Sequence, residues 1–191
     1  MKKKFELIGE PNEQGLKQIK YLRNLPGGIE KGDLGGWLEK EENLDQTGDA
    51  WVFGNARVSG DAQVFGDAQV SGNARVSGDA RVSGDAWVFG NAWVSGDAQV
   101  FGDARVSGGA WVSGDAWVSG NADWMIVGPI GSRNSCTTIT KGKDGDLVFC
   151  GCFTGSIDKF LARVEKTHGD NPHGKAYRAM IEMWKARQEA V

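Results

Sequence analysis

Alanine and valine recur with a six-residue period through the middle of the chain. Between residues 48 and 123 the phrase Gly-(Asp/Asn)-Ala-x-Val-(Ser/Phe) repeats, and only Gly109 replaces the usual Asp or Asn. In each Ala-x-Val segment the alternation of an extended strand points Ala and Val inward and the x residue outward. The Gly-Asp/Asn pair is typical of turns because glycine accepts a positive φ freely. Three such strands and turns predict a triangular coil of about 18 residues, repeated about four times.

The two flanking segments, 1–47 and 124–191, lack this period. Residues 4–8 read as a short strand, whereas residues 16–25 mix apolar and charged positions and fit a helix or a strand. From Gly27 onward, short apolar segments alternate with tight turns. We expect these to form irregular first coils that cap the stack, because a repeat stack needs an atypical end to cover its core and its strand edges.

The C-terminal segment predicts a small α+β cap. Residues 124–127 indicate a strand, and residues 137–140 and 147–153 indicate a hairpin. Ser156 is a suitable N-cap for a helix that ends at Gly169, and Asn171-Pro172 opens a second helix. Apolar residues follow helical spacing in both helices: Ile157, Phe160, Leu161 and Val164 in the first, and Tyr177, Met180, Ile181 and Trp184 in the second.

Charge and composition narrow the class of protein. The net charge is −3, but residues 48–123 carry nine aspartates, four arginines and no His, Lys or Glu. This acidity argues against nucleic acid as a partner, since phosphate binding requires a basic surface. No apolar run approaches the roughly 20 residues of a membrane span, and no apolar signal core follows the first lysines. We therefore expect a protein of the bacterial cytosol with no membrane partner.

The hexads resemble a known repeat. Val-Ser-Gly-Asn-Ala-Arg fits the hexapeptide pattern of left-handed parallel β-helix proteins, and that resemblance implies the left-handed coil. Residues 31–37, 42–44, 128–134 and 150–153, together with the hexads, resemble phage and prophage proteins that are often labelled transferases or polymer-forming repeat proteins. The resemblance covers nearly the whole chain. The fold expected is therefore mainly β: a left-handed parallel β-helix, as a triangular prism, with a C-terminal α+β cap.

The outward x positions sort into three faces when they are taken at intervals of 18 residues. The first face carries Trp51, Gln69, Trp87 and Arg105; the second carries Arg57, Arg75, Trp93 and Trp111; the third carries Gln63, Arg81, Gln99 and Trp117. Serine follows every valine on the second face, where Arg75 and Trp93 are close enough for a cation–π contact. Exposed Trp and Arg on a rigid surface favour coverage by another surface. We expect self-association, most simply as a trimer, with a host protein as the alternative partner.

Two constellations in the cap are candidates for binding. Gly131, Ser132, Arg133 and Asn134 lie in a flexible loop, 128–135, whose hydroxyls and guanidinium could hold a phosphate or carboxylate, although a plain connection explains the glycines equally well. Cys136, Cys150 and Cys152, with His168 or His173, could supply zinc ligands. Packing of the Cys-x-Cys thiols in the core is the favoured explanation, so we expect neither a metal nor a cofactor. The odd number of cysteines, all in one region, argues against a disulfide framework and favours reduced thiols.

Three functional hypotheses follow. The first is a non-enzymatic, oligomeric binding or scaffold protein that acts through Trp51, Arg57, Arg75, Trp87, Trp93, Trp111 and Trp117. The second is a small-molecule binder for a nucleotide-like signal that interferes with host defence. The third is an acyltransferase, which the hexapeptide resemblance implies. Since the coil has no histidine to serve as a general base, the sequence predicts no catalytic residue and disfavours the third.

Overall fold

The computed structural model describes residues 3–190, and its N-terminal part joins directly to the coil. Strands β1 (Phe5–Ile8) and β2 (Lys17–Tyr21) pair antiparallel, and β2 pairs antiparallel with β3 (Leu34–Leu38). The ambiguous residues 16–25 thus contain a strand. β3 in turn pairs parallel with β5, so that it forms part of an irregular first turn, as expected for a cap. A 3-10 helix (Glu41–Asn43) follows β3.

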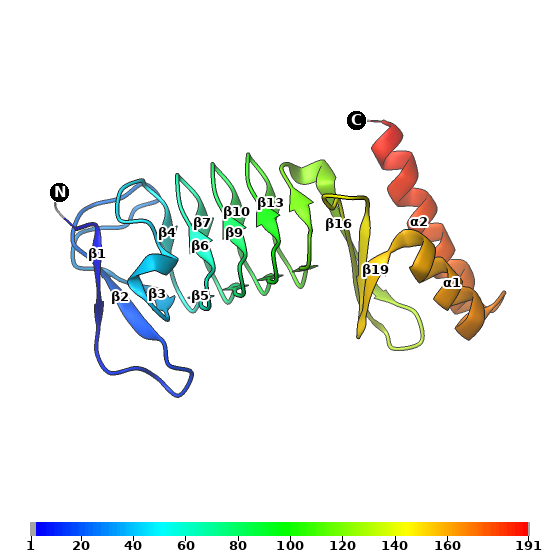
Figure 1. The fold of residues 1–191 in the computed structure, drawn as a ribbon, viewed down its shortest axis with the longest axis horizontal. Coiled ribbons are helices and arrows are strands. Elements are labelled where there is room, and N and C mark those ends of the chain that lie inside the picture. Colours follow the sequence, from blue (N-terminus) through cyan, green and yellow to red (C-terminus); the bar gives the residue numbers. More distant parts are fainter. Residues whose placement is uncertain (1–2, 191) are drawn as a thin grey trace.

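The hexads form a β-solenoid with three strands in each turn (Figure 1). Its strands are β4 (Trp51–Val52), β5 (Arg57–Val58), β6 (Gln63–Val64), β7 (Gln69–Val70), β8 (Arg75–Val76), β9 (Arg81–Val82), β10 (Trp87–Val88), β11 (Trp93–Val94), β12 (Gln99–Val100), β13 (Arg105–Val106), β14 (Trp111–Val112) and β15 (Trp117–Val118). Each strand from β4 to β12 pairs parallel with the strand 18 residues later, as in Arg57 with Arg75. Together with the turn that contains β3, the described chain makes about five turns, and the predicted 18-residue repeat is confirmed. The left-handed sense of the coil stays a prediction.

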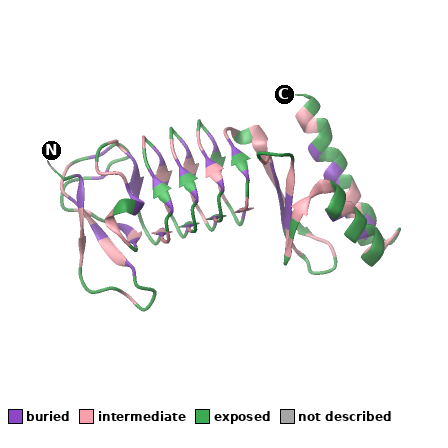
Figure 2. Cartoon of the chain, in the orientation of Figure 1, coloured by how far each residue is buried: buried purple, intermediate pink, exposed green. Residues whose placement is uncertain are grey.

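Backbone hydrogen bonds and small side chains hold the turns together. The N–H of Arg75 donates to the Ala92 carbonyl at 2.9 Å, and the N–H of Ser77 donates to the Val94 carbonyl at 3.0 Å. The alanine and valine of every complete hexad are at most 1% exposed, which confirms the predicted inward face. Figure 2 shows this interior as buried stripes between exposed corners. Because only Ala and Val enter, the interior packs tightly without polar groups.

Glycine is required at the corners for two reasons. Gly78 has a φ of +70°, which an L side chain rarely adopts. A Cβ added there would also lie 2.9 Å from the backbone nitrogen of Gly96 in the next turn. The corner glycines therefore set both the turn and the distance between turns.

Polar side chains close both open ends of the solenoid. At the N-terminal end, the buried Lys4 ammonium donates to the carbonyls of Gly48 (3.2 Å) and Ala50 (2.8 Å). The Tyr21 hydroxyl donates to the Val52 carbonyl at 2.8 Å and accepts from the Val52 N–H at 2.9 Å. These bonds satisfy backbone groups that have no preceding turn to pair with.

The last turn is closed by Asn121, in a second 3-10 helix (Asn121–Asp123) at the end of the coil, and by residues of the C-terminal segment. The N–H of Arg105 donates to Asn121 Oδ1 at 2.9 Å, and the N–H of Trp111 donates to Thr138 Oγ1 at 3.1 Å. The N–H of Trp117 donates to the Lys141 carbonyl at 2.9 Å. The cap therefore protects the edge strands against pairing with another chain.

The C-terminal cap is a four-stranded antiparallel sheet with two helices on its outer side (Figure 1). Its elements are β16 (Trp124–Ile130), β17 (Ser135–Thr140), β18 (Leu147–Cys150), β19 (Phe153–Ser156), α1 (Ile157–His168) and α2 (Pro172–Glu189). Ser156 and Asn171 cap the helices as predicted. Two expectations need correction. Residues 147–153 do not form one strand, because Gly151 and Cys152 turn the chain between β18 and β19. The loop 128–135 shrinks to residues 131–134, since β16 continues to Ile130.

The helices pack on the sheet through the predicted apolar positions. Phe160, Val164, Tyr177, Met180, Ile181 and Trp184 are buried, whereas Ile157 and Leu161 are only partly so. The Trp184 Nε1–H donates to Asp146 Oδ2 at 2.6 Å and ties α2 to the β17–β18 connection. Neither helix in the described part of the chain has the length and apolar character needed to cross a membrane.

Candidate functional site

The three outward columns lie as the 18-residue spacing predicts. The strand order β4–β7–β10–β13 aligns Trp51, Gln69, Trp87 and Arg105. The order β5–β8–β11–β14 aligns Arg57, Arg75, Trp93 and Trp111, and the order β6–β9–β12–β15 aligns Gln63, Arg81, Gln99 and Trp117. The sorting follows from the sequence because each strand stacks on the strand one turn later.

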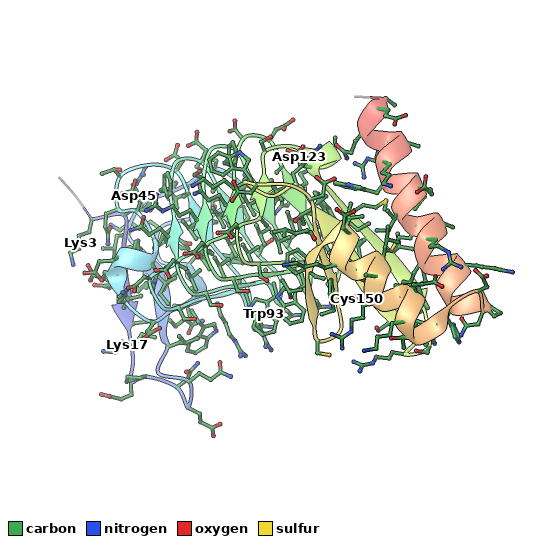
Figure 3. All side chains as sticks on the ribbon, turned by 45° about the vertical axis from the view of Figure 1, so that its right-hand side comes forward. Lys3, Lys17, Asp45, Trp93, Asp123 and Cys150 are labelled. Carbon is green, nitrogen blue, oxygen red and sulfur yellow. The ribbon has the colours of Figure 1, made fainter. Side chains whose placement is uncertain are left out.

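The second face carries a stacked tryptophan pair. The rings of Trp93 and Trp111 lie 5.2 Å apart and are inclined by only 4°. Trp93 remains 39% exposed, and its Nε1–H donates to Ser77 Oγ at 3.4 Å. Figure 3 labels Trp93 on the side of the coil toward which the β1–β2 loop projects. Gln14, Leu16, Arg57, Arg75 and Trp93 line a groove of about 350 Å³ there.

The expected cation–π pair on this face is wrong. Trp93 stacks on Trp111 in the following turn rather than under Arg75 in the preceding one. The cation–π contact in the coil lies on the first face, where the Arg105 guanidinium sits 5.9 Å from the Trp87 ring centre. Trp87 also donates to Ser71 Oγ at 3.3 Å and packs against Phe89 at 4.9 Å. Its polar and aromatic groups are therefore engaged within the chain.

Trp51 is buried, so its prediction as an interface residue is wrong. It is 8% exposed and forms part of the solenoid core cluster with Leu25 and Ile29. A Cβ on Gly27 would lie 3.2 Å from the Trp51 ring, so the N-terminal cap covers it closely. The sequence could not indicate this, because the covering segment comes from a region without a period.

Charges on the coil are separated between faces and corners. Aspartates form two corner columns, Asp49, Asp67, Asp85 and Asp103, and Asp61, Asp79, Asp97 and Asp115; the third corner carries Asn55, Asn73 and Asn91. In the asparagine column, Asn55 donates to Asn73 and Asn73 to Asn91, each at 3.2 Å. Within residues 3–190, Arg75, Arg81 and Arg105 form no ion pair, and of these aspartates only Asp49 and Asp61 do. The coil thus presents unpaired cations on its faces and unpaired anions at its edges.

A second candidate site is a pocket of about 240 Å³ in the cap, which we call the cap pocket. It is lined by Ser132, Arg133, Cys150, Cys152, Phe153, Phe160, Arg163, Val164, Thr167, His168 and Tyr177. Its wall comes from the 131–134 turn, the β18–β19 turn and the two helices, and Figure 3 labels Cys150 beside α1. Two residues of the predicted anion loop, Ser132 and Arg133, reach this pocket. The other two do not line it: Gly131 packs against the Tyr177 hydroxyl, and Asn134 adopts a positive φ of 50° in the turn.

Tyr177 is a buried residue of the cap pocket. Burial, helped by a hydrogen bond and charge interaction with Cys150, raises the pKa of Tyr177 to about 12, whereas the nearby Arg133 opposes the rise. The Cys150 thiol donates to the Tyr177 hydroxyl at 3.6 Å, and Thr137 Oγ1 donates to Cys150 Sγ at 3.2 Å. Tyr177 therefore stays a neutral hydroxyl at physiological pH.

The three cysteines neither cluster as zinc ligands nor pack together in the core. Cys136 and Cys152 are exposed, so the expectation of core cysteines is wrong for both, and Cys150 alone is partly buried. Cys152 lies in the turn rather than on a strand with Cys150. Within residues 3–190 no three His, Cys, Asp or Glu side chains are close enough to hold a metal ion, although His168 and His173 pack ring to ring at 5.7 Å.

Arg163, Thr167 and Tyr177 of the cap pocket were not singled out from the sequence. Tyr177 was assigned only to a helix stripe, and Arg163 and Thr167 carry no motif. The aspartate and asparagine columns were missed as well, although reading the corner positions at intervals of 18 residues would have found them.

Comparison with protein families identifies the repeat. Residues 50–67, 68–83, 80–96 and 98–114 match the family model of the YdcK beta solenoid repeat. The chain is a β-solenoid repeat protein. The matched residues all lie in the coil. The family model therefore does not cover the residues of the cap pocket. No curated protein gave a significant match to the chain.

Proposed function

We propose that this β-solenoid is a non-enzymatic scaffold that self-associates through its second face. The observation that carries the proposal is the stacked Trp93–Trp111 pair, with Trp93 39% exposed on a rigid sheet. Tryptophan and arginine are enriched in the centres of interfaces, and burial of an exposed ring of this size stabilises a complex. The phage or prophage origin and the transferase label rest on resemblance alone and form no part of this proposal.

Charge complementarity favours a second copy of the chain as the occupant. Arg75 is exposed on the second face without an ion pair, and Asp79 and Asp97 are exposed without one along the adjoining corner. If the second face of one copy covers this aspartate corner of the next copy, opposite charges meet around the tryptophan pair. A contact between two different surfaces closes into a ring when its rotation allows, and three prisms about one axis are the simplest such ring.

The test compares two tryptophans of equal exposure on different faces. Trp93→Ser removes the centre of the proposed interface, whereas Trp117→Ser changes a 40% exposed tryptophan on the third face. We expect light scattering to give three times the 20.5 kDa chain mass for the wild type and for Trp117→Ser, and a smaller mass for Trp93→Ser. Circular dichroism should stay unchanged in both, since neither ring lies in the core.

Two results would contradict the proposal. A wild-type protein with the mass of one chain would exclude self-association and leave a foreign partner for this face. Equal effects of Trp93→Ser and Trp117→Ser would show that general loss of apolar surface, rather than the second face, controls assembly. Arg75→Glu adds an independent check, because reversal of this charge should also lower the mass, and most clearly at low salt.

A further inference from the structure

The cap pocket is distinct from the proposed assembly face and concentrates positive charge. Arg133 comes from the 131–134 turn and Arg163 from α1, and no carboxylate lines the pocket. Among the described residues, neither arginine forms an ion pair. The nearby acidic residues of the helices are already engaged, since Glu165 and Asp170 pair with Arg178 at 3.0 and 2.8 Å. The positive charge of the pocket is thus not compensated by any carboxylate among residues 3–190.

Hydrogen-bonding groups accompany the two guanidinium groups. Ser132 and Thr167 contribute exposed hydroxyls, and His168 contributes a partly exposed imidazole. Arginine binds planar or tetrahedral oxyanions through several donors at once, and hydroxyls complete such a shell. A phosphate group, with its doubly charged form near neutral pH, fits this set of donors better than a singly charged carboxylate.

Aromatic rings line another part of the cap pocket. Phe153 and Phe160 lie 5.4 Å apart, and Phe160 meets Tyr177 edge to face at 5.4 Å. The Arg163 guanidinium lies 5.9 Å from the Phe153 ring centre, which places a cation directly beside this apolar surface. With a volume of about 240 Å³, the cap pocket is smaller than the pockets that hold drug-sized ligands. It suits a single ring with one anionic group.

Two glycines leave room for side chains of the cap pocket. A Cβ on Gly151 would lie 2.9 Å from Arg133 Nη1, so the guanidinium crosses the β18–β19 turn where glycine leaves room for it. A Cβ on Gly131, in the turn that carries Arg133, would overlap the Tyr177 hydroxyl, so glycine is needed there as well. The two glycines thus leave space for the Arg133 guanidinium and the Tyr177 ring, which both line the pocket.

We propose that the cap pocket binds a small aromatic or heteroaromatic phosphate monoester. Its phosphate group lies between Arg133 and Arg163, with Ser132 and Thr167 as further donors, and its ring lies against Phe153 and Phe160. This binding is independent of self-association, because none of these residues belongs to the coil.

The experiment measures the dissociation constant of phenyl phosphate for the full chain by isothermal titration calorimetry. Three compounds serve as comparators. Benzoate has a carboxylate in place of the phosphate, inorganic phosphate has no ring, and phenol has no charged group. We expect phenyl phosphate to bind more tightly than all three. Failure of phenyl phosphate to bind, or equal affinity for benzoate, would overturn the assignment.

Matched variants separate a built site from a generally basic surface. Arg133→Gln and Arg163→Gln should each weaken phenyl phosphate binding about tenfold or more, the usual effect of losing a charge-assisted hydrogen bond. Lys166→Gln removes the same charge from α1 at an exposed position outside the pocket and should change the affinity less than about twofold. Equal weakening by all three variants would overturn the proposal.

Thiol reactivity gives a second readout. In the variant Cys136→Ser, both remaining cysteines, Cys150 and Cys152, line the cap pocket. Phenyl phosphate should therefore slow alkylation of the exposed Cys152 by iodoacetamide, whereas phenol should not. An alkylation rate that saturating phenyl phosphate leaves unchanged would contradict binding at this site.

Discussion

Substitution of a corner glycine tests the physical basis of the solenoid most directly. Gly78 and Gly108 have nearly equal φ angles, +70° and +68°. They differ in their surroundings: a Cβ on Gly78 would lie 2.9 Å from the Gly96 nitrogen, whereas a Cβ on Gly108 would have nothing within 4 Å, because no further turn stacks on that corner. Alanine at the two positions therefore separates backbone strain from the clash between turns.

The expected magnitudes follow from this difference. A left-handed conformation costs an alanine about 1–2 kcal/mol, and both variants should lose this free energy of unfolding. In Gly78→Ala the backbone of the next turn must also move by a few tenths of an ångström. That movement strains the hydrogen bond from the Asp79 N–H to the Gly96 carbonyl, which is 3.0 Å long. Losing such a bond costs about 1 kcal/mol more, so Gly78→Ala should be less stable than Gly108→Ala by about that amount.

Urea denaturation followed by far-UV circular dichroism measures both losses. The m-values should match that of the wild type, so that a shift of the midpoint reports stability. Equal destabilisation of the two variants would refute the idea that glycine sets the distance between turns. A Gly108→Ala variant as stable as the wild type would refute the role of the positive φ.

Two further predictions concern the N-terminal closure. Burial lowers the pKa of Lys4 from 10.5 to about 8, so the unfolded chain binds this proton more tightly. As the pH rises from about 8 toward 10.5, the free energy of unfolding of the wild type should therefore increase by up to about 3 kcal/mol relative to that of Lys4→Met. A difference in unfolding free energy between the two proteins that does not vary with pH would contradict this. Tyr21→Phe leaves the N–H and the carbonyl of Val52 buried without their partner and should lower the unfolding free energy measured in urea by about 2–6 kcal/mol, since each of the two unpaired groups costs about 1–3 kcal/mol. A loss below about 1 kcal/mol would show that water replaces the hydroxyl.

The sequence alone determined the coil and much of the cap. Each hexad specifies a strand and a turn through contacts between residues near in sequence or at a constant spacing, so Val58, Val76 and Val94 stack without any distant information. The helices α1 and α2 were predictable for the same reason, because Ser156 and Asn171 cap them locally. These features depend on short-range geometry that repeats.

Tertiary structure alone decided which outward residues are free and which side chains share a pocket. Trp51 has the same hexad position as Trp87, yet the segment around Gly27 covers it. Arg133 and Arg163 lie in elements without a common period and reach one pocket only because the helices fold back over the sheet. Periodicity specifies neighbours one turn apart, whereas the packing of non-repetitive segments depends on the shape of every surface that they meet.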